Sequence, residues 1–214
     1  PILILVLIRY LGRLWLPWAD QQLGTQISLT FVGISFMAFR LSKLVIDVRS
    51  GAVEMPNLWD FFGFAFFVPT MIVGPINPAR VHMESLGGSP ANIFPTGTCL
   101  ARIVVGATKM LFLGGALSHL TYADFYLDGH PHRLGDFAVS AVAYYLYLYC
   151  NFSGFCDMAI GVAGLLRISV IENFRSPLLS RNITDFWSRW HISLSSYVRE
   201  VVFNPLSAAL ARRL

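Results

Sequence analysis

The residue types best suited to chemistry gather in one short segment of the 214-residue chain, between Asn182 and His191. An imidazole exchanges protons near neutral pH, and burial beside aromatic rings keeps it neutral, so His191 is a candidate proton acceptor. Trp187 precedes it by four residues, so on one continuous helix the indole and the imidazole share a face. Asp185 and Arg189 have the order and spacing of a helical ion pair, and Asn182 is placed to cap the helix. The pattern predicts a capped helix that holds a titratable group against an aromatic wall.

A second candidate, Asp157, is a carboxyl group inside the apolar run 154–161. Burying such a charge costs several kcal/mol unless a partner or water compensates it. We therefore expect Asp157 to face protein rather than lipid and to have a polar partner, such as Arg189 or Arg181. Asp157 and Asp185 are both assigned to a buried polar network.

Other residues whose side chains could take part in catalysis or metal binding lack a supporting pattern. The sequence has no His/Cys cluster at metal-ligand spacing, no nucleophile motif and no glycine-rich phosphate loop, so we expect no metal and no tightly bound cofactor. A single histidine is more often a packing or interfacial residue, which is the interpretation given to His82, His119, His130 and His132. The 16 basic residues are spread singly along the chain, which argues against nucleic acid as a partner.

The elements that position these groups must lie largely in lipid. Apolar residues make up 55% of the chain and charged residues 13%, against roughly 25% charged in an ordinary globular domain, so one soluble core cannot hide the apolar surface. A span needs about 20 mostly apolar residues, and residues 21–39, 98–120 and 137–156 qualify, the last continuing to 168. Residues 2–18 are either the end of a span or an interfacial helix. The sequence predicts an all-α, polytopic membrane protein with the lipid bilayer as a partner.

Two segments interrupt this helical pattern. Residues 58–76 are broken by Pro69 and by the pair Gly74-Pro75, which predicts a broken or re-entrant helix packed against other protein. Residues 172–181 are polar and contain a proline, so they should be non-helical and lie within or at the edge of the membrane region. Basic residues lie near both ends of most spans, so the orientation in the membrane stays open.

The run Asn-Ile-Thr-Asp-Phe-Trp-Ser-Arg-Trp-His-Ile-Ser-Leu-Ser at 182–195 resembles the signature of the membrane-bound O-acyltransferase family. Glu-Asn-Phe at 172–174 before it and Asn-Pro-Leu at 204–206 after it strengthen the resemblance, which is greatest to the branch of alginate O-acetyltransferases and D-alanyl-transfer proteins. The block 152–161 resembles the one that precedes the signature there. We therefore interpret residues 1–214 as a single fragment, truncated at both ends, with part of this family's fold.

The resemblance implies an enzyme that moves an acyl group, acetyl first, from a thioester donor to a hydroxyl of an extracytoplasmic polysaccharide. The donor would be acetyl-CoA or an acyl carrier protein, and an accessory transferase is a further expected partner. His191 is implied to be catalytic, with a second histidine expected beyond Leu214. Residues implied to position substrate or line a tunnel are Trp187, Trp190, Arg189, Asn182 and Asn173. The plasma (inner) membrane is the expected location, crossed several times.

Two alternatives stay open. The first is D-alanyl transfer to teichoic acid, by the same chemistry on another polymer. The second is a non-enzymatic polytopic protein, a transporter or an assembly subunit, in which Asp157, Arg189 and His191 form a polar relay. The dense Trp-x-x-Trp-His segment favours the enzyme, because a transporter has no particular need for it.

Overall fold

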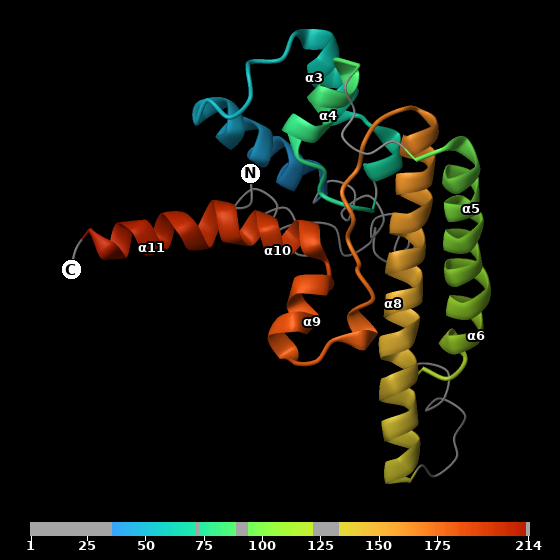
Figure 1. Cartoon of the computed structure of the whole chain (residues 1–214). Helices are drawn as coiled ribbons and strands as arrows, with labels where there is room; N and C mark the ends of the chain where they lie inside the picture. Colours follow the sequence, from blue (N-terminus) through green and yellow to red (C-terminus); the bar gives the residue numbers. More distant parts are fainter. Residues whose placement is uncertain (1–35, 72, 89–93, 122–132, 213–214) are drawn as a thin grey trace, which may run out of the picture. The chain divides into compact units, whose positions relative to one another are not determined.

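The computed structural model describes residues 36–71, 73–88, 94–121 and 133–212 (Figure 1). Within these ranges the regular elements are all helical, with a single isolated β-bridge, which confirms the expected all-α class. Residues 2–18, most of the expected span 21–39, His130 and His132 lie outside the described residues. The chain divides into two compact units, which we call the hairpin unit (Phe94–Leu166) and the split unit (Pro1–Ile93 with Arg167–Leu214).

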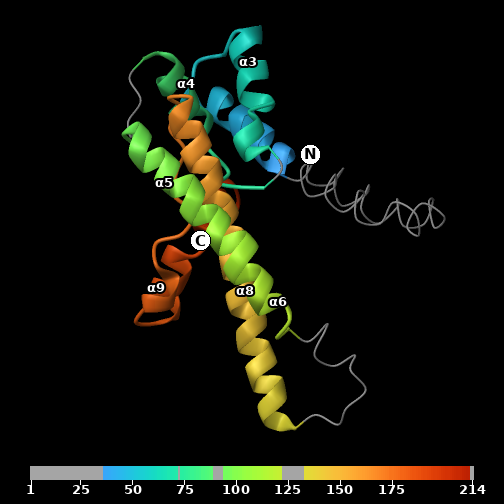
Figure 2. The ribbon, with the colours of Figure 1, turned by 90° about the vertical axis from the view of Figure 1, so that its right-hand side faces the viewer.

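The hairpin unit consists of two long helical rods that pack against each other, side by side in Figure 1 and crossing in the turned view of Figure 2. The first runs through α5 (Thr96–Ala107), a π-helical turn η2 (Thr108–Leu113) and α6 (Gly114–Ser118). The second is α8 (Leu134–Leu165), which is uninterrupted because the sequence over that stretch contains no proline. Both rods, Thr96–Ser118 and Leu134–Leu165, are long and apolar enough to cross a membrane. The two spans expected in this part of the sequence are therefore helices of sufficient length.

Glycines let the two rods approach until their backbones touch. A Cβ added to Gly106 would lie 2.5 Å from the carbonyl oxygen of Gly154, and one added to Gly161 would lie 2.7 Å from that of Cys99. Small residues at such positions are the usual means of close helix packing in lipid, where no hydrophobic effect drives helices together. Glycine is therefore required at this interface by the space available.

We expect Gly106→Ala to destabilise the protein by about 1–3 kcal/mol, because the new methyl group meets rigid backbone. The measurement is thermal unfolding of the detergent-solubilised protein. Gly115→Ala is the matched control, since its Cβ would meet nothing within 4 Å, and it should be neutral or slightly stabilising. Equal melting temperatures for the two variants would contradict this close packing.

The amino-terminal part of the split unit is a set of short helices around a small apolar core. Residues 36–49 are helical, followed by α3 (Leu58–Ala65), the 3₁₀ turn η1 (Val68–Thr70) and α4 (Ala79–Leu86). Leu44, Phe64 and Ala79 form the buried centre. The expected break within 58–76 is confirmed, because the helix ends at Ala65 and residues 73–78 are non-helical.

A buried arginine and a buried histidine both contact the ring of Phe64. Arg40 is 1% exposed; its guanidinium lies 4.7 Å from the centroid of the Phe64 ring and donates to the Phe64 carbonyl oxygen. His82 is 2% exposed and packs edge-on against Phe64 and Phe67. Burial, assisted by the nearby charge of Arg40, lowers the pKa of His82 to about 4. His82 is thus a neutral core residue at pH 7, as the sequence interpretation holds.

The low pKa of His82 predicts that the protein loses stability on acidification. Its pKa is about 4 when folded and about 6.5 when unfolded, so the unfolded state binds more protons between these values. Stability should therefore fall as the pH decreases through this window, by about 3 kcal/mol for this one group. Thermal unfolding at pH 7.5 and 4.5 should show a smaller loss in His82→Gln than in wild type. The exposed residue His119 supplies the control variant His119→Gln, and an unchanged loss in His82→Gln would refute the assignment.

The carboxyl-terminal part of the split unit begins with an extended segment, residues 168–176. Left-handed residues flank it, Arg167 with φ 60° at its start and Ser176 with φ 47° at its end. The elements that follow are η3 (Pro177–Leu179), α9 (Ile183–Arg189), α10 (Ile192–Val198), the π-helical turn η4 (Arg199–Phe203) and α11 (Asn204–Ala211) (Figure 1). The expected non-helical character of residues 172–181 is confirmed apart from the single 3₁₀ turn, while their depth in the membrane remains a prediction.

Candidate functional site

Helix α9 begins as the sequence predicts. The Asp185 N–H donates to Asn182 Oδ1 over 2.8 Å, and Arg189 Nε donates to Asp185 Oδ1 over 2.7 Å, so the cap and the ion pair are both confirmed. The other carboxylate oxygen of Asp185 accepts from the Arg181 N–H over 3.0 Å. The Arg189 hydrogen bond, with help from Arg181, lowers the pKa of Asp185. The Asp185 side chain is 23% exposed, so its expected network exists but is only partly buried.

Helix α9 ends at Arg189, directly before Trp190 and His191, so the expected continuous helix through His191 is absent. Trp190 is extended, with φ −103° and ψ 126°, and His191 is left-handed, with φ 46° and ψ 54°. Trp187 and His191 therefore do not share a helical face, and that prediction is wrong. The physical reason is tertiary. The Trp190 N–H still donates to the Phe186 carbonyl of α9, but the Arg189 carbonyl accepts from the Arg175 N–H and the Ile192 N–H donates to the Asn173 carbonyl, so the chain pairs with the extended segment after Arg189.

An aromatic cluster forms around Trp190. Its indole stacks on Phe186, with centroids 5.5 Å apart, and meets the edge of Phe174 at 5.1 Å. Trp187 is 55% exposed and contacts Phe186 edge-on. Trp190 is thus a packed residue, whereas much of Trp187 is available to a substrate or another part of the protein. Phe174 and Phe186 belong to the motif blocks 172–174 and 182–195, but sequence reasoning did not assign them to the site. The helical spacing of Phe186 to Trp190 could have indicated their contact, whereas Phe174 lies 16 residues from Trp190.

His191 is half-buried at the junction of α9 and α10. Burial lowers its pKa to about 4, so the imidazole is neutral at pH 7. A neutral imidazole has one N–H donor and one lone-pair acceptor, so it can bind a hydroxyl and a carbonyl oxygen at the same time.

Asn173, expected to line a tunnel, is fully buried. Its Oδ1 accepts from the Ser193 hydroxyl over 2.7 Å and from the Ser193 N–H over 3.1 Å. Sequence reasoning missed Ser193, which has no nucleophile context and proves to be a hydrogen-bonding partner. It also missed Asn77, whose amide donates to the Ser169 carbonyl and accepts from the Ile171 N–H. The polar residues beside the Gly74-Pro75 break are the feature that could have indicated this network.

Asp157 belongs to the hairpin unit and has two cationic partners. Arg102 Nη2 lies 3.0 Å from Asp157 Oδ1, and Lys109 Nζ lies 2.7 Å from Oδ2. The expectation of a polar partner for Asp157 is confirmed, but Arg189 and Arg181 as the partners are wrong. Arg102 and Lys109 are seven residues apart, two helical turns, and so lie on the same face of the neighbouring rod. That spacing within an apolar span could have indicated that the two cations share a partner, but not that the partner is Asp157.

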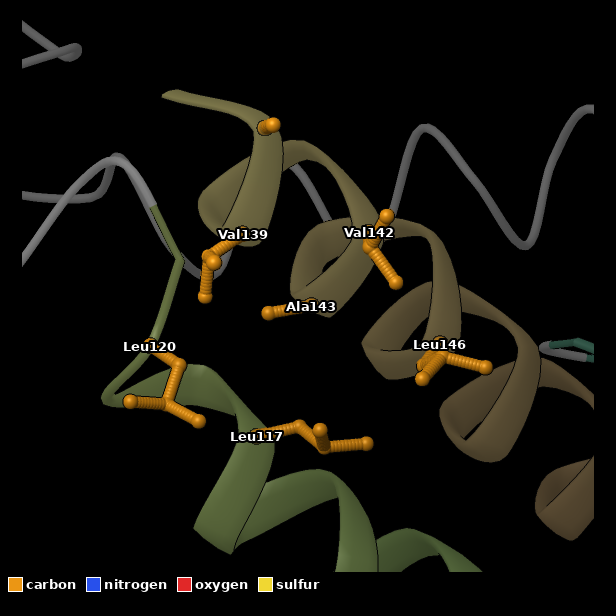
Figure 3. A pocket seen from close by; sticks show the side chains of 7 residues that line it. Leu117, Leu120, Val139, Val142, Ala143 and Leu146 are labelled. Atoms are coloured by element: carbon orange, nitrogen blue, oxygen red, sulfur yellow. The ribbon is translucent and has the colours of Figure 1, made fainter. Parts of the chain in front are cut away.

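The hairpin unit also carries an apolar groove of about 400 Å³ near the end of α6 (Figure 3). Leu117 and Leu120 approach it from one rod, and Val139, Val142, Ala143 and Leu146 from α8. These aliphatic side chains offer no group that could transfer a proton or bind a metal. Nor do the parts of the chain that the structure describes bring together three His, Cys, Asp or Glu side chains able to hold a metal ion.

The features of the two units indicate the class of protein. In the hairpin unit, two helices long and apolar enough to span a bilayer, with an ion triad between them, are features of a helical membrane protein. The split unit separately holds a neutral histidine at a helix junction. The chain belongs to the membrane-bound O-acyltransferase family, whose profile matches residues 2–214.

The curated relatives that the chain matches are named for acyl transfer to several polymers. It is 34% identical over 176 residues to the probable alginate O-acetylase AlgI of Azotobacter vinelandii, covering 82% of this chain and 35% of that protein. It is 32% identical to the teichoic acid D-alanyltransferase of Bacillus subtilis, covering 82% and 45%, and 31% identical to the peptidoglycan O-acetyltransferase of Helicobacter pylori, covering 81% and 33%. The chain therefore spans between a third and a half of the length of these relatives.

Proposed function

We propose that the whole protein transfers an acyl group, acetyl first, from a thioester donor to a hydroxyl of an extracytoplasmic envelope polysaccharide. The observation that carries this proposal is the family match across residues 2–214, which includes His191 and its flanking aromatic residues. In the reaction the hydroxyl oxygen forms a bond to the acyl carbon, the carbon–sulfur bond breaks, and the hydroxyl proton ends on the departing thiol. Catalysis requires a proton acceptor and a donor to the developing oxyanion.

His191 is the group in this segment that can serve such a reaction. A general base works best with a pKa near the operating pH, and a pKa of about 4 makes His191 a weak proton acceptor. The low pKa supports a role in which the neutral imidazole positions the hydroxyl or donates to the thioester oxygen. The second histidine expected further along the full-length chain is then the better candidate for the base.

The other predicted residues contribute in different ways. Asn182 caps α9, Trp187 and Arg189 lie on it, and the exposure of Trp187 leaves it available to line a substrate path. The burial of Asn173 and the packing of Trp190 favour indirect roles.

We place the protein in the plasma (inner) membrane as a multi-pass protein, with acetyl-CoA or an acyl carrier protein as donor and an accessory transferase as a further partner.

D-Alanyl transfer to teichoic acid is the second candidate function. The 32% identity to the Bacillus subtilis D-alanyltransferase is close to the 34% identity to the alginate O-acetylase, so similarity alone separates the two weakly. Family membership counts against the transporter and assembly-subunit alternatives.

The test uses the full-length protein in native membrane vesicles. Radiolabelled acetyl-CoA, acetyl-acyl carrier protein and D-alanyl-acyl carrier protein are each supplied with alginate, peptidoglycan or teichoic acid, and label bound to the polymer is measured. Acetyl transfer to a polysaccharide is the expected result, and D-alanyl transfer to teichoic acid would support the second candidate. No transfer from any donor, with a correctly folded protein, would refute the acyltransferase proposal.

A further inference from the structure

We propose that Ser193 and Asn173 are positioning residues, whose buried hydrogen bonds hold His191 in its left-handed conformation and so aim its imidazole at the reacting groups. This inference rests on the proposed function for its catalytic consequence. Its structural part, the restraint on His191, stands on the hydrogen bonds alone.

The backbone of His191 needs such a restraint. Its φ of 46° lies in the left-handed region, which residues with a Cβ adopt rarely and at an energetic cost. A residue stays there only when its surroundings fix the chain on both sides. On the amino-terminal side, Trp190 pairs with Phe174, and the Arg175 N–H donates to the Arg189 carbonyl over 3.0 Å.

On the carboxyl-terminal side, Asn173 accepts three hydrogen bonds from the residues that follow His191. The Ile192 N–H donates to the Asn173 carbonyl over 3.0 Å, and both the N–H and the hydroxyl of Ser193 donate to Asn173 Oδ1. Asn173 is 0% exposed and Ser193 is 2% exposed. Hydrogen bonds so deeply buried hold their geometry, because a broken bond leaves polar groups that water cannot reach.

The Ser193 hydroxyl also ties His191 to a distant part of the split unit. Its oxygen accepts from the Ile76 N–H over 3.0 Å, directly after the Gly74-Pro75 break. The hydroxyl therefore joins three segments: the break, the extended segment through Asn173, and the start of α10. Removing this one oxygen breaks the link to Ile76 and one of the three hydrogen bonds to Asn173.

A matched control lies at the other end of the same extended segment. The Ser85 hydroxyl accepts from the Ser169 N–H over 3.0 Å and donates to the Val81 carbonyl over 2.8 Å. Like Ser193, it is a buried hydroxyl that accepts from one backbone N–H and donates to one oxygen. Ser85→Ala thus removes an equivalent pair of hydrogen bonds without touching the residues around His191.

The experiment compares wild type, Ser193→Ala, Ser193→Cys and Ser85→Ala in the full-length membrane protein. We expect Ser193→Ala to lower kcat for acyl transfer on the order of 10²-fold with little change in KM, since misplacement by about 1 Å can have that effect. Ser85→Ala should lower the melting temperature but leave kcat near wild type. If Ser193→Ala does not fold, Ser193→Cys takes its place in the test. Cysteine roughly keeps the volume of serine, and its thiol forms only weak hydrogen bonds.

A second readout does not depend on turnover. Diethyl pyrocarbonate modifies accessible imidazoles, and mass spectrometry gives its rate at His191, with exposed His119 as the internal reference. The rate at His191 should rise several-fold in the Ser193 variants and stay unchanged in Ser85→Ala. Equal rates and equal kcat in the two alanine variants would overturn the proposal. If wild type transfers no acyl group, the proposed function fails, while the modification rates still decide whether Ser193 restrains His191.

Discussion

His191→Ala in the full-length protein should lower kcat for acyl transfer on the order of 10²- to 10⁴-fold if the imidazole is the general base. A positioning role predicts a different pattern, in which His191→Gln keeps appreciable activity because an amide can still donate and accept hydrogen bonds. The low pKa of His191 favours the second pattern, since it disfavours proton uptake at neutral pH.

The measurement is transfer of labelled acyl groups to the native acceptor by purified variants that express and fold like wild type. His119→Ala is the control, because His119 is exposed at the end of the first rod. Wild-type turnover in both His191 variants would return His191 to the status of a packed interfacial residue.

Asp157→Ala should destabilise the protein by about 3–5 kcal/mol, the usual result of removing one member of a buried ion pair. The carboxylate is 16% exposed and is bound by both Arg102 and Lys109, so its loss leaves two cations inside candidate membrane spans without their shared anion. The expected phenotype is a loss of protein yield, rather than a loss of turnover at normal yield.

Two further variants isolate the charge effect at Asp157. Lys109→Met combined with Asp157→Ala removes one of the two stranded cations and should recover part of the lost stability. Asp185→Ala breaks the ion pair with Arg189 on a more exposed helix and should have a much smaller effect. Normal yield and melting temperature for Asp157→Ala would contradict the importance of the triad.

The candidate site shows where sequence reasoning succeeds and where it stops. His191 and its aromatic neighbours could be found by residue type and by resemblance, because the motif is dense and continuous. Their relative orientation could not be found in this way. The expected shared face of Trp187 and His191 assumes a helix that continues through His191, whereas α9 ends at Arg189. The hydrogen bonds of Ser193 to Ile76 and Asn173 were invisible, because the partners are 117 and 20 residues away.

The sequence by itself determined the features that depend on neighbours within a few turns. The apolar rods follow from unbroken hydrophobic stretches, the Asn182 cap and the Asp185–Arg189 pair from helical spacing, and the break before Ile76 from Gly74-Pro75. Tertiary structure alone decided the left-handed turn at His191, the burial of Asn173 and the cationic partners of Asp157. Each of these requires a group from a separate segment, and local spacing carries no information about which distant segment supplies it.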